Sequence, residues 1–581
     1  MSADTRPGRL AQVAPHLAAL LAVGVLIGYV RTGLLLDDAF LLARAAHRFS
    51  FEVLDFALRT TDYRIHLWVH EDPVVFHFFR PLCSLSLWIE HRIWGTNAWG
   101  YHLTNVILHL ANAWMLWRLA IRCGLGRGSA LLGAFAWALS IQTIPSAGWI
   151  SGRTEVLWCS CMLIATHALL RWRDGGGPRW FVASLIASGL AACAKESGLV
   201  TPLLELLAVW YSGLARPGEP SRALTPRRVA LIILPAAVVF GVRLATIGFS
   251  LPPEPYMDVP RSALDASWTT VKPALYLSAG YLSLPLSHWG PLEWMHTHPW
   301  SLAAILPVGI LATVVLAYAA GRSSLLLWLG WFAIALLPVM PVRPTSLYLY
   351  VPMMGLTMLV ASAFQRSRQV AFAAWLAITT IVGSGAHLFT QQYIAEEWRT
   401  SSIQLATVNR LLEARGATRL VTIDTPVWLY ALPAAIGMKS PRLRFDTWFV
   451  NFKPSLNAVE GSSVQWRNDL KLEIKAPPGG FLHSVFERFL AFGGAPPERP
   501  DPATQPVEVA IEGPRANPQR LVVTFKDASV RDSALIVRFT RDGIRLIEPA
   551  APSVSGRHVP RPGGEPRAAP SAGASKGSAG A

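Results

Sequence analysis

Charged residues are scarce in this chain. Only 15% of its 581 residues are Asp, Glu, Lys or Arg, and 52% are hydrophobic, whereas soluble proteins carry about a quarter charged residues. This deficit, with a mean hydropathy of +0.35, excludes an ordinary soluble protein and indicates an integral membrane protein. The net charge of +16 does not indicate nucleic-acid binding, because Lys and Arg occur in short clusters between apolar runs, as in cytoplasmic loops.

Cysteine is also scarce, and common short motifs are missing. The five cysteines have neither the spacing of a zinc site nor that of a disulfide framework. The sequence contains no Walker or dinucleotide-binding glycine motif and no tetratricopeptide or other periodic repeat. The N-terminal apolar stretch follows Arg6 and Arg9 without a small-residue cleavage pattern, so we expect an uncleaved first span rather than a signal peptide.

Apolar windows of membrane-spanning length predict about eleven transmembrane helices. They lie at residues 12–30, 103–121, 129–147, 153–172, 179–194, 198–214, 228–247, 301–320, 324–341, 347–364 and 369–389. Basic clusters follow the even-numbered windows and precede the first, which favours a cytoplasmic N-terminus and an extracytoplasmic C-terminus. The apolar segment 267–294 would invert this pattern if it crossed, so we expect an amphipathic or re-entrant element there.

The chain divides into a membrane part and a smaller C-terminal part. We expect a transmembrane domain over residues 1–395, with a first outer loop at 36–102 and a second at 248–300. Short β-branched runs such as "RLVTIDTP" and "SALIVRFTRDGIRLIE" predict a soluble α/β or β-rich domain over 396–550. Residues 551–581 are rich in Pro, Gly, Ala and Ser, which is typical of a disordered tail.

Two adjacent carboxylates, Asp37 and Asp38, directly follow the first span. Either they are a solvated loop start, or they act together with the four cations predicted on the same face, Arg80, Arg153, Lys195 and Arg343. A carboxylate beside cations stays ionised and suits a general base, while the cations suit a phosphate leaving group. "FFRPL" places Arg80 before a proline, which favours extended backbone; an arginine that snorkels to the interface is the alternative.

Other polar residues mark the ends of later spans. His102 and Asn105 share one helical stripe with His109, where helix–helix hydrogen bonding is commoner than metal ligation. A more flexible metal site at His70, Glu71, Asp72 and His77 stays open.

Opposite charges are adjacent at two further span boundaries. Arg153 with Glu155, and Lys195 with Glu196, either cap helices and neutralise one another or contact a ligand. Near Arg343, the tyrosines of "LYLYVP" fit either the site or an aromatic belt at the membrane interface.

These motifs, in this order, resemble the GT-C glycosyltransferases of the protein O-mannosyltransferase type. The strings that carry the resemblance are "LLLDDAF", "FRPL", "WGYHLTNVILHL", "AFAWALSIQTIPSAGWISGRTEVL", "ACAKESGLVTPLL" and, more weakly, "LYLYVPMMG". They match the bacterial relatives of the transmembrane-and-tetratricopeptide O-mannosyltransferases well over residues 15–215 and loosely over 300–390. Glu155 departs from the Asp of many relatives, and the repeats that could present protein acceptors are absent.

The resemblance implies transfer of a sugar from a polyprenyl-phosphate donor to an acceptor hydroxyl on the periplasmic side of a bacterial inner membrane. It implies that Asp37 or Asp38 is the base and that Arg80, Lys195 and Arg343 are candidates to face the lipid phosphate. Further candidates for binding the lipid phosphate or the sugar are His102, Asn105, Arg153, Glu155 and Glu196. We expect hexosyl transfer in which the acceptor attacks the anomeric carbon in line and inverts its configuration. A protein or a glycan acceptor is compatible, membrane lipid is a partner, and a divalent metal stays open as a cofactor. The alternatives are a lipid-linked oligosaccharide ligase or polymerase, and a transporter without chemistry.

Overall fold

The structure is a computed structural model with helices at every apolar window of the sequence. One unit contains Met1–Ile547 and a second contains Glu548–Ala581, and the helices and strands that the structure describes belong to the first. The structure describes residues 9–34, 38–50, 56–59, 65–67, 75–215, 222–248, 263–286, 299–342, 344–425, 435–436, 443–450, 462–476, 506–512, 519–540 and 543–549.

The helices begin where local sequence favours a start. Proline stands in the first turn of α4, α9, α11 and α16, where its fixed φ suits the helix and its missing N–H costs nothing. The helices are α1 (Arg9–Leu26), η1 (Ile27–Arg31), α2 (Asp38–Ala45), α4 (Pro81–Trp94), α5 (Ala98–Arg122), α6 (Arg127–Ala138), η3 (Ile141–Thr143), α7 (Ile144–Gly148), α8 (Arg153–Arg173), α9 (Pro178–Ala194), η4 (Glu196–Val200), α10 (Thr201–Ala215), α11 (Pro226–Ile247), α12 (Ala263–Tyr281), α14 (Pro299–Ala320), α15 (Arg322–Leu336), η5 (Leu337–Val339), η6 (Ser346–Leu349), α16 (Pro352–Ser367), α17 (Val370–Arg415) and α20 (Ala528–Asp532).

Four helices are long and apolar enough to cross a membrane by themselves, within the described residues: Val13–Arg31, Pro226–Ile247, Arg322–Val339 and Val370–Arg415. The pair Arg127–Ala138 and Ile141–Gly148 qualifies only together, across a bend of 53°. Helices such as α8 fail on composition because they carry polar side chains, yet most of α8 is buried among other helices. The total of about eleven spans therefore stays a prediction.

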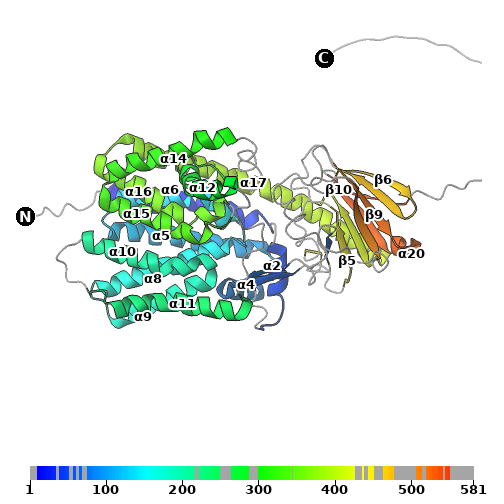
Figure 1. Ribbon diagram of the computed structural model, residues 1–581, viewed down its shortest axis with the longest axis horizontal. Coiled ribbons are helices and arrows are strands. Elements are labelled where there is room, and N and C mark those ends of the chain that lie inside the picture. The colour runs from blue at the N-terminus through cyan, green and yellow to red at the C-terminus, as the bar shows by residue number, and fades with distance from the viewer. Residues whose placement is uncertain are drawn as a thin grey trace, which may run out of the picture. The chain divides into compact units, whose positions relative to one another are not determined.

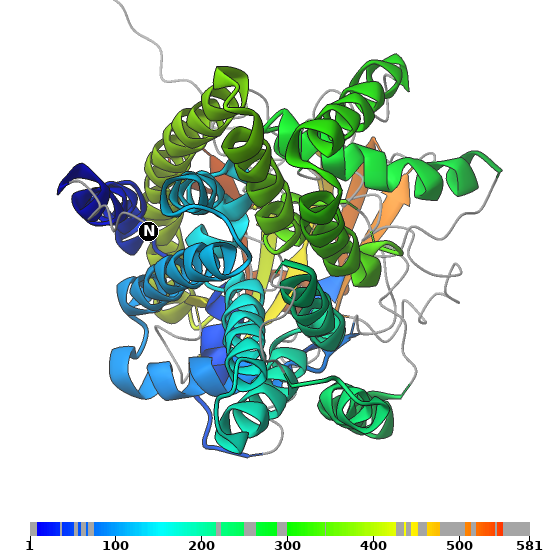
Figure 2. The ribbon, with the colours of Figure 1, turned by 90° about the vertical axis from the view of Figure 1, so that its left-hand side faces the viewer.

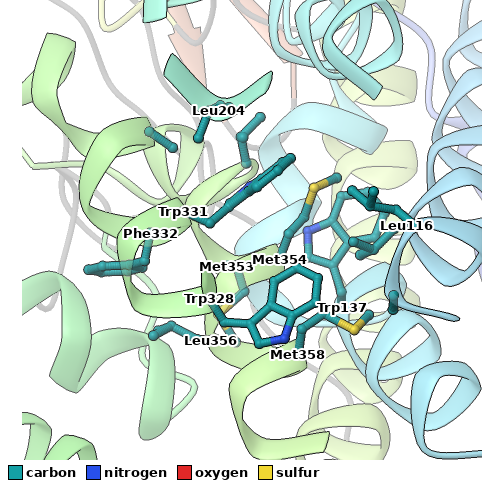
Figure 3. Packing of buried hydrophobic residues seen from close by; sticks show 14 of the residues in the cluster. Leu116, Trp137, Leu204, Trp328, Trp331, Phe332, Met353, Met354, Leu356 and Met358 are labelled. Atoms are coloured by element: carbon teal, nitrogen blue, oxygen red, sulfur yellow. The ribbon is translucent and has the colours of Figure 1, made fainter. Parts of the chain in front are cut away.

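The core of the helical part forms around α16. Trp137 of α6 and Trp328 and Trp331 of α15 are fully buried, and Met353 and Met354 of α16 lie among them (Figure 3). Thioether side chains adapt to the irregular gaps between indole rings. Seen along the helices in Figure 2, α1 (dark blue) lies at the outside of this packing, which agrees with its many exposed apolar side chains.

One glycine sets the approach of two of these helices. A Cβ at Gly355 of α16 would lie 2.3 Å from the carbonyl oxygen of Trp328. The α15 backbone therefore packs directly against α16 at this level, and any side chain at position 355 would push the two helices apart.

One helix lies outside the apolar windows of the sequence, and another continues past the end of its window. Residues 263–281 of the second outer loop form α12, which packs against α14 and contacts α16; its buried Lys272 donates to the carbonyls of Met340 (2.9 Å) and Val342 (3.3 Å). The last helix, α17, continues for 46 residues to Arg415, well past the expected membrane boundary near residue 395.

The C-terminal part contains two sheets. The segments on either side of residues 541–542 pair in antiparallel register, with Thr540 opposite Gly543. One sheet has the order β11-β10-β4-β5-β2, with β10, β4, β5 and β2 parallel, and the other has the antiparallel order β6-β7-β9-β8. Two further strands, β1 and β3 of the first outer loop, pair with each other in antiparallel register. The described strands of the whole chain are β1 (Phe56–Arg59), β2 (Ile65–Leu67), β3 (Val75–Phe78), β4 (Arg419–Ile423), β5 (Asp446–Phe449), β6 (Ser463–Asn468), β7 (Lys471–Lys475), β8 (Val507–Glu512), β9 (Arg520–Phe525), β10 (Ala534–Thr540) and β11 (Gly543–Leu546).

The first outer loop takes part in the C-terminal sheet. Strand β2 from that loop pairs with β5, with Ile65 opposite Thr447. An apolar cluster joins the same regions, because Phe40 of α2 belongs to it together with Leu405 of α17 and Leu420 of β4. The loop that begins at the carboxylate pair and the C-terminal strands therefore share both a sheet and a core.

Candidate functional site at the helix ends

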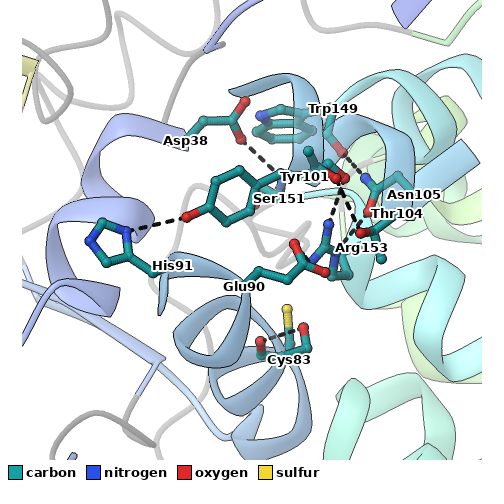
Figure 4. A network of polar contacts seen from close by, with 12 residues as sticks. Asp38, Cys83, Glu90, His91, Tyr101, Thr104, Asn105, Trp149, Ser151 and Arg153 are labelled. Carbon is teal, nitrogen blue, oxygen red and sulfur yellow. Dashed lines mark hydrogen bonds and ion pairs between the residues drawn. The ribbon is translucent and has the colours of Figure 1, made fainter. Parts of the chain in front are cut away.

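Asp38 is the first residue of α2, and its side chain is fully buried. Its Oδ1 accepts a hydrogen bond of 3.0 Å from the backbone N–H of Ser151, in the turn between α7 and α8 (Figure 4). Asp38 is therefore not a solvated loop residue. Asp37 lies outside the described residues, as does Arg343.

Arg153 fixes the turn that holds Asp38. Its Nε donates to Oδ1 of Asn105 (2.7 Å), its Nη2 donates to the carbonyl of Tyr101 (2.7 Å), and its Nη1 forms an ion pair with Glu90 (2.6 Å). Asn105 in turn donates to the carbonyl of Trp149 (2.8 Å). Of the two alternatives for Arg153 and Glu155, mutual neutralisation is wrong: residues two apart on a helix point away from each other, and Glu90 of α4 is the partner of Arg153.

Arg80 pairs with Glu196. Its Nε and Nη2 lie 3.0 Å and 2.9 Å from Oε2 of Glu196, and its guanidinium lies 4.2 Å from the ring centre of Phe78. Burial raises the pKa of Glu196, but the charge and hydrogen bonds of Arg80 outweigh burial and hold that pKa below its ordinary value. Arg80 has φ −132° and ψ 54°, so its φ is extended as predicted and its ψ is not.

Lys195 pairs with Glu155 rather than with its neighbour Glu196. The ammonium donates to Oε1 of Glu155 and lies 4.8 Å from the ring centre of Tyr348. Burial lowers the pKa of Lys195 although the carboxylate of Glu155 opposes that shift. The four groups form two crossed pairs, Arg80–Glu196 and Lys195–Glu155, each joining residues from different parts of the chain.

The remaining candidates make internal hydrogen bonds. His102 Nε2 donates to the carbonyl of Gly33 (2.6 Å), which anchors α5 beside η1. His109 accepts from Tyr350 Oη at Nδ1 (2.7 Å) and donates to the Ala138 carbonyl (2.9 Å), and Tyr350 is fully buried, which rules out the aromatic belt at that position.

A metal site finds no support in the described residues, among which no group of three or more His, Cys, Asp or Glu is placed to hold an ion. The alternative site at His70, Glu71 and Asp72 lies outside the described residues, as does the side chain of His77.

Sequence reasoning missed Glu90 and Ser151. Glu90 is a lone carboxylate in the "LWIEHRIW" stretch of α4, and its burial beside the guanidinium of Arg153 is the unusual feature. Ser151 acts through its backbone N–H, so its residue type carries no signal.

The stretch from Ser151 to Glu155, where α8 begins, joins the two halves of the site. Ser151 holds Asp38, and Glu155, four residues later, holds Lys195. Backbone hydrogen bonds from Arg153 N to Ile150 O and from Glu155 N to Gly152 O make this stretch helix-like, and four residues of helix rise about 6 Å. The fold and the site thus define a polytopic α-helical membrane protein with charged pairs gathered at one end of its helices.

Known proteins are similar in sequence to the part of the chain that holds this site. Residues 80–239 match the family model described as dolichyl-phosphate-mannose-protein mannosyltransferase, so the predicted resemblance to protein O-mannosyltransferases is confirmed there. The match includes all the described site residues except Asp38. It leaves the C-terminal sheets without a counterpart in that family model.

Individual relatives agree with that match. The chain is 30% identical to the Drosophila melanogaster protein O-mannosyl-transferase Tmtc2 over 36% of this chain and 23% of that protein. It is 27% identical to the Homo sapiens TMTC2 over 36% of this chain and 26% of that protein. The chain therefore spans about a quarter of the length of these curated relatives.

A solved structure can also be superposed. ArnT from Cupriavidus metallidurans in the apo state aligns over 89% of this chain and 99% of that one, with 15% sequence identity and a TM-score of 0.43.

Proposed function

We propose that this protein is a glycosyltransferase that moves a sugar from a polyprenyl-phosphate-linked donor to an acceptor hydroxyl. The observation that carries the proposal is the short stretch from Ser151 to Glu155, where α8 begins: Ser151 holds Asp38 and Glu155 holds Lys195. A carboxylate that could take a proton and a cation that could face a phosphate are thereby attached to one rigid element. The family match over residues 80–239 supports the same reaction class.

The chemistry requires one base and one stabilised leaving group. The acceptor oxygen attacks the anomeric carbon while its proton passes to an Asp carboxylate, Asp38 or Asp37. The bond from the anomeric carbon to the phosphate oxygen breaks, the configuration inverts, and the polyprenyl phosphate leaves with the bonding electrons. Arg80 and Lys195, with Arg343, stabilise the negative charge that develops on that phosphate.

Both described cations already have carboxylate partners. Arg80 is neutralised by Glu196 and Lys195 by Glu155, so a phosphate has to compete with these carboxylates for the same N–H groups. Such competition favours a strongly charged phosphate over a neutral ligand. It also means that the pairs hold the cations in position before the donor arrives, so less ordering is needed on binding.

Topology supports an extracytoplasmic site. The basic clusters predict that the N-terminus is cytoplasmic, and the first outer loop then lies on the opposite face, in the periplasm of a bacterial cell. The pairing of β2 of that loop with β5 supports a periplasmic location for the C-terminal sheets as well. The sheet that contains β4 shares an apolar cluster with Phe40, two residues after Asp38, which suits a role in presenting the acceptor, either a protein Ser or Thr or a glycan or lipid hydroxyl.

The base assignment is tested by single substitutions. Asp37→Asn and Asp38→Asn, assayed separately in membranes with a labelled polyprenyl-phosphate sugar, should include at least one folded variant without transfer. Asp174→Asn is the matched control, because that carboxylate pairs with Arg122 (2.6 Å) at the other end of α8. Full transfer by both loop variants would remove the base assignment. Mass analysis of glycoproteins and glycans in a deletion strain identifies the acceptor.

A further inference from the structure

The end of α8 that is remote from Asp38 carries a cluster of arginines stacked on tryptophans. Arg222 and Arg228 lie over the ring of Trp172, at 5.6 Å and 5.2 Å from its centre. A second tryptophan nearby, Trp180, is stacked in the same way. We call these two indoles and the arginines on them the arginine–tryptophan cluster.

Trp180 carries the second half of the cluster. Arg171 and Arg179 lie 4.6 Å and 6.0 Å from its ring centre. The helices that supply these residues pack together, since α9 contacts both α8 and α11 (Figure 1). Four guanidinium groups from three neighbouring segments are thereby gathered on two aromatic rings.

The cluster is held in place by backbone contacts. The backbone N–H of Arg222 donates to the carbonyl of Arg173 (3.1 Å), which ties the segment before α11 to the end of α8. Arg173 Nη1 donates to the carbonyl of Val209 (2.6 Å), which ties α8 to α10, and Trp172 itself is buried. The stacked side chains therefore stand on a fixed base rather than on a loose loop.

The charged side chains of the arginine–tryptophan cluster are all arginines. Within the part of the chain that the structure describes, none of the four stacked arginines has an ion pair, and the nearby Asp174 is paired with Arg122 (2.6 Å). Contact with an indole ring leaves guanidinium N–H groups available for oxygen ligands. In Arg228, Nη1 already donates to the carbonyl of Ala223 (2.7 Å), so its other N–H groups would serve a ligand. Phosphate oxygens match that planar fork in two hydrogen bonds, so the cluster is suited to a phosphate group.

Its depth points to a lipid rather than to a soluble phosphate. Helix α8 has 21 residues between Arg153 and Arg173, which at the usual rise is about 30 Å, the thickness of the hydrocarbon core of a bilayer. With Asp38 and Arg153 at one surface, the cluster lies at the headgroup level of the other. Tryptophan is enriched at that level, and basic pockets between helix ends there bind anionic headgroups.

We propose that the arginine–tryptophan cluster binds the phosphate of an anionic phospholipid in the leaflet opposite the candidate active site. The proposal does not depend on the glycosyltransferase assignment. It predicts a preference for anionic over zwitterionic lipid that requires the stacked arginines, and it predicts that charge elsewhere on the same surface cannot replace them.

Lipid retention measures this directly. The full-length protein is purified from nanodiscs of phosphatidylglycerol and phosphatidylcholine in equal amounts, and the lipids that remain bound are quantified by native mass spectrometry. Wild type should retain phosphatidylglycerol preferentially, and Arg222→Gln with Arg228→Gln should lower that retention roughly tenfold. Arg127→Gln with Arg322→Gln is the matched control, because this double variant removes two exposed arginines at helix starts. The control variant should retain phosphatidylglycerol as wild type does.

The remaining outcomes decide against the proposal. Equal losses in the two double variants would mean that general surface charge attracts the lipid, and equal retention of both lipids by wild type would mean that the cluster selects no headgroup. Displacement of phosphatidylglycerol by millimolar inorganic phosphate would identify a site for the free ion. If the stacked double variant fails to fold, Arg171→Gln with Arg179→Gln tests the ring of Trp180 in the same assay.

Discussion

Glu90 and Arg153 form a buried ion pair, with 2.6 Å between Oε2 and Nη1, that joins α4 to the start of α8. The same arginine contacts Asn105 and the Tyr101 carbonyl of α5. Three helices therefore meet at one guanidinium, two residues after the N–H that holds Asp38 (Figure 4). We infer that Arg153 positions the site and does not bind the donor.

Removing one member of this pair should cost both stability and activity. Glu90→Gln leaves the Arg153 charge buried without its counter-ion, and breaking buried pairs in this way typically costs about 3 kcal/mol or more. The turn at Ser151 should then lose its fixed position, so transfer should fall even at temperatures where the variant stays folded. Thermal unfolding in detergent and a transfer assay measure the two effects.

A surface carboxylate gives the comparison. Glu396 of α17 is exposed, so Glu396→Gln should change neither quantity. If Glu90→Gln lowered the unfolding temperature and left kcat and KM untouched, the ion pair would hold helices together without orienting Asp38.

The sequence predicts the helices well and the contacts between them poorly. The apolar windows are local in sequence, and each one is occupied by a helix. The partner of Arg153 could not be predicted, because Glu90 lies on a different helix and its approach depends on how α4 packs. Likewise the pairing of β2 with β5 joins residues about 380 positions apart through only three register pairs, too short a strand for periodicity to reveal.

Arg80 is predicted to matter through the charge that it places near the donor phosphate. Arg80→Gln should lower kcat/KM for the lipid-linked donor about 100-fold, as expected when one well-placed donor to a developing oxyanion is lost. Arg118→Gln is the control, since Arg118 is exposed and lies 5.9 Å from the ring of Trp114, outside the site. Similar losses in both variants would show that total basic charge, and not Arg80, governs donor use.

The Arg80–Glu196 pair predicts a stability loss in acid. The pKa of Glu196 is held below its ordinary value in the folded protein, so the Glu196 carboxylate takes up a proton less readily in the folded state than in the unfolded chain. Glutamates of an unfolded chain titrate at about pH 4.3. The contribution is fully present above that pH and is lost as the pH falls through the lower folded pKa. Unfolding temperatures between about pH 3 and 7 should therefore fall less steeply in acid for Glu196→Gln than for wild type. Parallel profiles for the two proteins would contradict the pairing.

The sheet shared by the first outer loop and the C-terminal part should make the two depend on each other. Thr447 lies in β5, between β4 and β2, and is fully buried. A proline there removes a backbone donor and does not fit an inner strand, so Thr447→Pro should release β2 and expose the first outer loop to protease. Because Asp38 begins the helix of that loop, transfer should fall as well.

Gln465→Pro is the control, since Gln465 is exposed on the edge strand β6 of the other sheet. Limited proteolysis followed by mass spectrometry locates the cuts: new cuts within residues 46–80 only in Thr447→Pro support the coupling, and an unchanged pattern with full transfer would separate the C-terminal sheet from the site.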